Sequence, residues 1–229
     1  MNLEEIKQAL TDGEPQTRVK AMRLLRDYPA DVAVPLLESQ MGHGDFLVRS
    51  FIAMGLGLYP SDRTVKTLKK LLDDGDHSVR AEAAGSLGRC DAEVLPDLVA
   101  AFRRDDNWLV RRSLLESLVE FRQPAALMEV CELAIAGDNV SVTEAAIDAL
   151  TLLHKTEFSD QALELLLPFV SDDWWQIRWR TARSLGFFEQ EKAIAARQFL
   201  GKDDDHRVVG GAMEAVMATD GNRSNGDDG

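Results

Sequence analysis

A helical phrase that returns about every 31 residues constrains this fold more than any other feature of the sequence. One copy runs from Leu71 to Leu87: an acidic turn, a Val-Arg pair, then small or apolar residues at helical spacing. With Val79 as the register mark, Ala83 and Leu87 follow four and eight places later. The other copies of this three-residue set are Thr17/Ala21/Leu25, Val48/Ile52/Leu56, Val110/Leu114/Leu118, Val142/Ala146/Leu150, Ile177/Thr181/Leu185 and Val208/Ala212/Val216. Successive marks lie 31, 31, 31, 32, 35 and 31 residues apart, which indicates a repeat array.

Each repeat is predicted to be a pair of helices, A and B. Apolar residues at spacings of three and four mark helix A, and helix B begins near the register mark. Residues suited to N-capping stand three places before the mark: Asp45, Asp76, Asn107, Asn139 and Asp205. Pro29, Pro60 and Pro124 fall between one B helix and the next A helix, where a helix must stop. Since neither helix buries its apolar stripe alone, the pairs must stack. We predict an all-α fold, a right-handed α-solenoid of about seven helical hairpins.

The repeats continue without a linker, so one solenoid domain is expected over residues 1–218, followed by a disordered acidic tail over 219–229. The sequence contains neither an apolar run long enough for a membrane span nor a secretory signal, and its two cysteines make no disulfide framework. A cytoplasmic location is expected. The net charge of −13 argues against nucleic acid as a partner, because such binding neutralises phosphates with basic residues.

An aspartate followed six residues later by arginine occurs in four repeats. Together with the Val-Arg pair and a closing Leu-Gly, as in Leu87-Gly88, this pattern resembles HEAT repeats, in particular the phycobilisome-lyase HEAT-like class. That resemblance implies HEAT-like hairpins whose Asp and Arg side chains form a ladder along the turns. The ladder residues would be Asp12, Arg18, Asp74, Arg80, Asp105, Arg111, Asp172 and Arg178.

The fifth repeat has Gly137 and Thr143 at the two ladder positions. Acid and base are lost together there, as expected if they are partners. The second repeat (His43/Arg49) and the seventh (Asp203/Val209) lose only one member each. We interpret the ladder as structural, with charge-assisted hydrogen bonds that tie one turn to the next.

A second register lies two residues before the mark. It contains mainly aromatic residues and histidine: Phe46, His77, Trp108, Trp175 and His206. Two interpretations remain open. These rings are staples between adjacent hairpins, or they form a contact ridge for a partner, because Trp and Arg dominate binding hot spots. Four nearby side chains would extend such a ridge: Arg112, Trp179, Arg180 and Arg183.

No catalytic or metal-binding motif is found in the sequence. The four histidines are spread over different repeats and lack the spacing of a metal site. Deoxyhypusine hydroxylase also has HEAT-like repeats, but its iron ligands are His-Glu pairs, and this sequence contains no His-Glu pair. Cys90 and Cys131 are interpreted as small apolar residues of the helices. No resident cofactor is expected.

Three functions remain open. The first is a non-catalytic protein-binding scaffold; the resemblance implies a phycobiliprotein, or a related repeat chain, as its partner in phycobilisome assembly or turnover in a cyanobacterium. The second is a subunit of a bilin lyase, which would hold a phycobilin transiently on the aromatic row, with an arginine at its propionates. The third is a scaffold for iron–sulfur assembly, although two cysteines are too few for an all-cysteine cluster.

Overall fold

The computed structural model describes residues 1–223, except for the side chains of Asp12, Pro15 and residues 216–223. Within that part of the chain, every regular element is a helix, and the helices form seven hairpins, as predicted. The fold is an α-solenoid. No helix in the described residues is both long enough and apolar enough to cross a membrane.

The chain contains two compact units, Met1–Phe121 and Arg122–Gly229. The single solenoid domain expected over residues 1–218 stays a prediction. The boundary follows helix α8, at Arg122, whose φ of 50° is the left-handed conformation that commonly terminates a helix. The repeat after this boundary is the one in which Gly137 replaces the acidic ladder residue.

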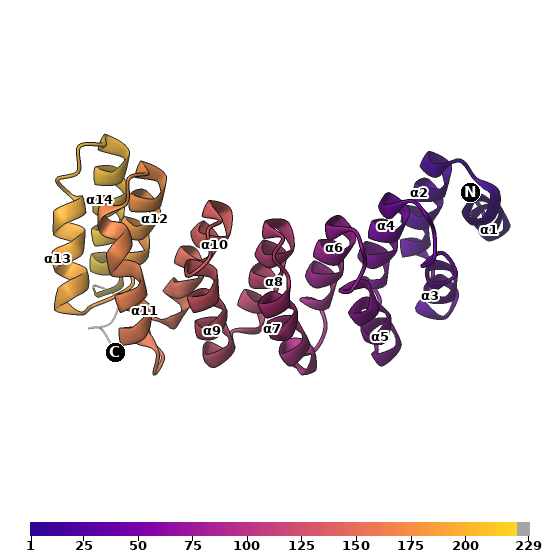
Figure 1. Ribbon diagram of the computed structural model, residues 1–229, viewed down its shortest axis with the longest axis horizontal. Helices are drawn as coiled ribbons and strands as arrows, with labels where there is room; N and C mark the ends of the chain where they lie inside the picture. The colour runs from indigo at the N-terminus through magenta and orange to yellow at the C-terminus, as the bar shows by residue number, and fades with distance from the viewer. Residues whose placement is uncertain (224–229) are drawn as a thin grey trace. The chain divides into compact units, whose positions relative to one another are not determined.

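The first unit contains four hairpins, α1/α2 to α7/α8 (Figure 1). Its elements are α1 (Leu3–Asp12), α2 (Pro15–Leu24), η1 (Leu25–Asp27), α3 (Ala30–Glu38), α4 (Phe46–Leu56), α5 (Asp62–Leu71), α6 (His77–Leu87), η2 (Ala92–Val94), α7 (Leu95–Arg104) and α8 (Trp108–Phe121). The even-numbered helices are the predicted B helices. Each packs against the B helix of the neighbouring hairpin, in the order α2, α4, α6, α8.

The second unit contains three hairpins built in the same way. Its elements are α9 (Pro124–Ile135), α10 (Val140–Leu150), η3 (Thr151–Leu153), α11 (Ser159–Leu166), η4 (Leu167–Ser171), α12 (Trp175–Leu185), α13 (Glu191–Leu200) and α14 (His206–Arg223). The B helices α10, α12 and α14 pack in sequence. Helix α14 continues past the tail boundary predicted at residue 219, and residues 224–229 lie outside the described residues.

The three positions that recur in every repeat of the sequence also form the buried core. Six of the seven marks, from Val48 to Val208, are buried, and so is every described residue four or eight places later. Thr17, in the first hairpin, is the exception and is exposed.

The closing Leu-Gly of a repeat has a packing reason. A Cβ atom at Gly88 would lie 2.7 Å from both Cβ and Oγ of Ser117 on the next B helix. The Ser117 hydroxyl in turn donates to the Ala84 carbonyl at 3.0 Å. The same relation holds one repeat earlier, where Ser86 lies against Gly57. Glycine therefore allows adjacent B helices to approach closely enough for the serine to bond to the neighbouring backbone.

Candidate functional site

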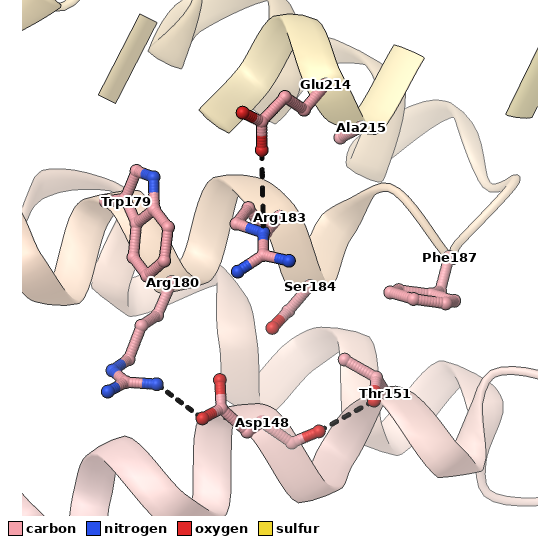
Figure 2. A pocket seen from close by; sticks show the side chains of 9 residues that line it. All are labelled: Asp148, Thr151, Trp179, Arg180, Arg183, Ser184, Phe187, Glu214 and Ala215. Carbon is pink, nitrogen blue, oxygen red and sulfur yellow. Dashed lines mark hydrogen bonds and ion pairs between the residues drawn. The ribbon is translucent and has the colours of Figure 1, made fainter. Parts of the chain in front are cut away.

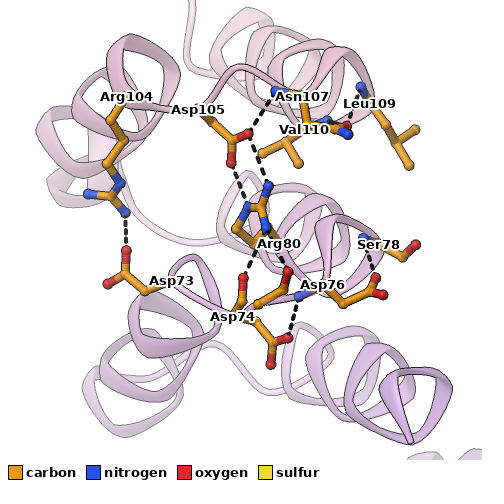
Figure 3. A network of polar contacts seen from close by, with 11 residues as sticks. Asp73, Asp74, Asp76, Ser78, Arg80, Arg104, Asp105, Asn107, Leu109 and Val110 are labelled. Atoms are coloured by element: carbon orange, nitrogen blue, oxygen red, sulfur yellow. Dashed lines mark hydrogen bonds and ion pairs between the residues drawn. The ribbon is translucent and has the colours of Figure 1, made fainter.

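The five predicted N-cap residues lie at the starts of B helices, as expected. Asp76 is the N-cap of α6, and its carboxylate accepts a hydrogen bond from Ser78 N at 2.8 Å. Asn107 does the same for Leu109 N at 3.0 Å (Figure 3). The remaining predicted caps also accept from the first turn of their helices: Asp45, Asn139 and Asp205. These residues satisfy backbone donors that a helix start leaves unpaired.

The ladder ties one turn to the next, as predicted, but each ion pair joins two consecutive repeats and not the Asp and Arg of one repeat. Arg80 donates through Nε to Asp105 at 2.6 Å and through Nη2 at 3.2 Å, and Asp105 belongs to the next repeat. Within its own turn, Arg80 Nη1 donates to backbone oxygens, the Asp74 carbonyl at 3.0 Å and the Gly75 carbonyl at 3.4 Å (Figure 3). The idea that Asp and Arg of one repeat are mutual partners is therefore wrong.

Pairing between consecutive repeats explains the second and seventh repeats, which seemed to lack one member of the Asp–Arg pair. Arg49 binds Asp74 at 2.7 and 2.8 Å, and Arg178 binds Asp203 at 2.7 and 2.9 Å. Arg49 and Asp203, which seemed to have lost their partners, are thus full members of the ladder. These hydrogen bonds hold the pKa of Asp74 and of Asp203 below its ordinary value.

The other predicted ladder residues do not form this Asp–Arg pair in the described structure. Arg18 donates to the carbonyls of Leu10 at 2.9 Å and Thr11 at 3.2 Å, and it also contacts His43 Nε2 at the acidic position of the next repeat. Arg111 lies with its guanidinium 4.5 Å from the centroid of the Phe102 ring. Asp172 accepts from Trp174 N at 2.8 Å. The side chain of Asp12 lies outside the described residues.

The second register marks the first residue of successive B helices, as expected. Its members are Phe46, His77, Trp108, Trp175 and His206. Trp175 is covered by the Arg207 guanidinium of the next hairpin, 3.4 Å from the ring centroid, a contact between adjacent hairpins that favours the staple interpretation for this ring. Phe46 and Trp108 remain 39% and 46% exposed, so these two still suit the contact-ridge interpretation.

The structure gathers three of the predicted ridge residues elsewhere, on the B-helix face of the second unit. Trp179, Arg180 and Arg183 of α12 line a cavity of about 470 Å³ (Figure 2). The remaining lining residues come from the segments before and after them: Asp148, Thr151, Ser184, Phe187, Glu214 and Ala215. We call this the α12 cavity. Sequence reasoning missed Asp148, Phe187 and Glu214.

Packing fixes the Trp179 indole on one wall of the α12 cavity. A Cβ atom at Gly211 of α14 would lie 2.8 Å from Trp179 Cδ1, so the ring rests directly against the α14 backbone. The Arg183 guanidinium also lies over this ring, 4.8 Å from its centroid, which is a cation–π distance. Phe187 is 52% exposed and packs beside His154, with ring centroids 5.6 Å apart. The cavity thus presents rigid aromatic surface to its opening.

Each arginine of the predicted ridge already has a carboxylate partner. Arg180 bonds to Asp148 and lies 3.7 Å from Glu144, and Arg183 lies 3.9 Å from Glu214 (Figure 2). Arg112 bonds to Glu116 at 2.9 Å. A ligand anion would have to compete with these carboxylates, so the α12 cavity is charge-balanced.

Neither cysteine is prepared as a nucleophile or a cluster ligand. Burial raises the pKa of Cys131 to about 12, and its Sγ lies 3.8 Å from the Ala146 carbonyl. Burial also raises the pKa of Cys90. Both changes disfavour the thiolate, which is the reactive and ligating form. Across the described residues, no three His, Cys, Asp or Glu side chains are grouped so that they could hold a metal ion.

Comparison with known proteins identifies the repeat type. The family model for HEAT repeats matches residues 3–88 and 65–151, which together make up more than half of the chain. No curated protein sequence matches significantly.

Three solved structures illustrate the likeness of fold. The E. coli protein YibA has a TM-score of 0.65 at 18% identity, covering 95% of this chain and 93% of that one. A chain from the complex of CpcE and CpcF of phycocyanin lyase from Nostoc sp. has a TM-score of 0.54 at 19% identity, covering 96% and 88%. A chain from the complex of Kap95p with RanGDP has a TM-score of 0.62 at 16% identity, covering 93% of this chain and 35% of that one.

Proposed function

The chain belongs to the HEAT-repeat family, and we propose that it acts as a non-catalytic protein-binding scaffold. Within each unit, the stacked hairpins present a row of B helices, the kind of surface with which solenoids bind other proteins. The observation that carries the proposal is the α12 cavity, where Trp179, Arg183 and the exposed Phe187 stand on one helix and its C-terminal turn. Aromatic residues and arginine are the types that dominate protein-binding hot spots.

Charge balance supports a protein rather than a small anion as the occupant. Because Arg180 and Arg183 already bind carboxylates, their charges are offset at the surface. A protein partner gains mainly from burying the Trp179 and Phe187 rings, and it can leave both ion pairs intact at the rim.

For the partner we propose a phycobiliprotein or a related repeat chain, and for the setting the cytoplasm of a cyanobacterium. The support comes from the Val-Arg and Leu-Gly phrases, which resemble the phycobilisome-lyase HEAT-like class. A second support is the fold, which is similar to that of a chain from the phycocyanin lyase structure, where CpcE and CpcF form a complex.

The test is titration calorimetry with purified phycocyanin α and β subunits. We expect the Arg183→Ala/Phe187→Ala variant to raise Kd at least tenfold, since two hot-spot truncations cost about 2 kcal/mol or more. Phe199→Ala is the matched control, because Phe199 is 60% exposed in the same unit but does not line the cavity. Absence of binding to both subunits would reject the phycobiliprotein, and equal affinity of the double variant and wild type would reject the α12 cavity.

A bilin lyase subunit is the second candidate, and the same cavity is its support. The Trp179 ring would stack a tetrapyrrole, while Arg180 or Arg183 would exchange a carboxylate partner for a propionate. A phycobilin absorbance shift on mixing, lost in Trp179→Ala, would favour the lyase over the scaffold. An unchanged spectrum would eliminate it. The iron–sulfur scaffold finds no support in the surroundings of Cys90 and Cys131.

A further inference from the structure

A second hollow lies on the B-helix face of the first unit, between α2 and α4. It has a volume of about 600 Å³, within the range of binding clefts. Its floor includes Phe51, Met54 and Leu58 of α4 and the turn after it. Met54 and Leu58 are 41% and 53% exposed. We call it the α2–α4 groove.

The rim of the α2–α4 groove is basic in a strongly acidic protein. Lys20, Arg23 and Arg26 line it, and no Asp or Glu is among its described lining residues, although the chain carries a net charge of −13. The three cations are spaced three residues apart, so they lie on one side of α2 and η1 over a length of about 9 Å.

These cations differ from the arginines of the α12 cavity in their partners. Within the described residues, neither Lys20 nor Arg23 forms an ion pair, and Arg26 has only the adjacent Asp27 at 3.6 Å, with both side chains mostly exposed. The Arg23 guanidinium lies 5.3 Å from the centroid of the Phe51 ring. This contact places the charge against the apolar floor, beside any group that enters the groove.

The floor itself is firmly built. Leu25 and Leu37 are fully buried beneath it, and the Tyr59 hydroxyl donates to the Leu25 carbonyl at 2.6 Å, which ties the end of the α4 hairpin to η1. Burial raises the pKa of Tyr59 further above its ordinary value. The groove is therefore a pre-formed surface.

We propose that the α2–α4 groove binds an acidic amphipathic helix of a protein partner. Two or three apolar side chains of that helix would cover Phe51, Met54 and Leu58. Carboxylates at spacings of three and four would face Lys20, Arg23 and Arg26, because such a row also spans about 10 Å over seven residues. The proposal rests on the scaffold function but concerns a different surface from the α12 cavity.

The experiment uses two fluorescein-labelled helical peptides of 16 residues with identical apolar positions, one carrying glutamates and the other lysines. The net charge of the protein favours the lysine peptide at long range, so a preference for the glutamate peptide reports the local rim. By fluorescence anisotropy, we expect the full-length protein to bind the glutamate peptide at least tenfold more tightly, with an affinity that falls as salt rises.

Three variants locate the binding. Lys20→Glu/Arg23→Glu is expected to reverse the peptide preference, and Met54→Asp to weaken glutamate-peptide binding at least tenfold. Lys66→Glu, an exposed change on α5 away from the groove, should leave it unchanged. Equal binding of the two peptides, or undiminished glutamate-peptide binding by the double variant, would overturn the proposal.

Two further measurements distinguish other possible occupants of the α2–α4 groove. Co-sedimentation with phosphatidylserine vesicles that depends on Lys20 and Arg23, without glutamate-peptide binding, would reassign the groove to a lipid surface and overturn the proposal. Self-association that Met54→Asp abolishes, again without peptide binding, would overturn it in favour of a second copy. The Arg183→Ala/Phe187→Ala variant should still bind the peptide, which keeps the outcome for this groove separate from that for the α12 cavity.

Discussion

Arg80 and Asp105, 25 residues apart, form a two-pronged ion pair that joins consecutive repeats. The side chains are only 18% and 8% exposed. The same guanidinium bonds to the backbone of its own turn at Asp74. One arginine thus fixes the conformation of its own turn and the spacing to the next hairpin.

Arg80→Ala should therefore destabilise the protein by about 3 kcal/mol, because it leaves a largely buried carboxylate without its partner. Urea unfolding followed by circular dichroism gives the free-energy difference. Arg112→Ala is the control, since it breaks an exposed pair with Glu116 on one helix, worth about 0.5 kcal/mol or less. Similar losses in the two variants would contradict a special role for the ladder.

The ladder also predicts the direction of the pH dependence. The hydrogen bonds from Arg49 and Arg178 lower the folded-state pKa of Asp74 and Asp203 relative to the unfolded chain. The stabilisation is present above the unfolded pKa and is lost as pH falls through the folded pKa. Melting temperatures should therefore drop steeply below about pH 4. Asp203→Asn should be less stable than wild type at pH 7 and should lose less on acidification; parallel pH curves would count against this assignment.

The sequence sufficed to predict the seven hairpins and the N-caps because both depend on local signals, the apolar spacing around Val79 and the cap at Asp76. It did not reveal the partner of Arg80. In a periodic chain, Asp74 and Asp105 are equivalent by pattern, and only the stacking distance decides between them.

The sequence did not predict the α12 cavity, although it singled out three of its lining residues as part of a contact ridge. Trp179, Arg180 and Arg183 drew attention by residue type. Asp148 and Glu214 are ordinary acidic residues, but they stand six places after their register marks, as Arg183 does. Comparing the position six places after the mark across the repeats would have identified both residues. The division into two units has a weaker signal in the sequence, which is the presence of Gly137 at the acidic ladder position of the fifth repeat.

Replacing His43 by aspartate should stabilise the protein. His43 occupies the acidic ladder position of its repeat, and Arg18, which is 9% exposed, contacts its Nε2 atom. His43→Asp should add a charge-assisted pair like those of Asp74 and Asp105, worth about 1 to 2 kcal/mol. Thermal unfolding measures the effect. His43→Asn keeps an acceptor without the charge, so the prediction fails if the two variants are equally stable.

Gly85 and Gly88, both near the end of α6, should respond in opposite directions to alanine. A Cβ at Gly88 would meet Ser117 Cβ and Oγ at 2.7 Å and the Ser117 Cα at 3.0 Å. Gly88→Ala must therefore push α8 away and break the Ser117 bond to the Ala84 carbonyl, a loss of about 1 to 3 kcal/mol. At Gly85, no atom beyond the adjoining helix backbone lies within 4 Å of an added Cβ, so Gly85→Ala should gain up to about 1 kcal/mol from helix propensity. Urea unfolding of both variants measures the contrast. Gly85 lies in α6 and Gly88 is its C-cap. A loss in both variants would mean that this end of α6 tolerates no added methyl group, and the close approach at Ser117 would not be the reason for the repeated Leu-Gly.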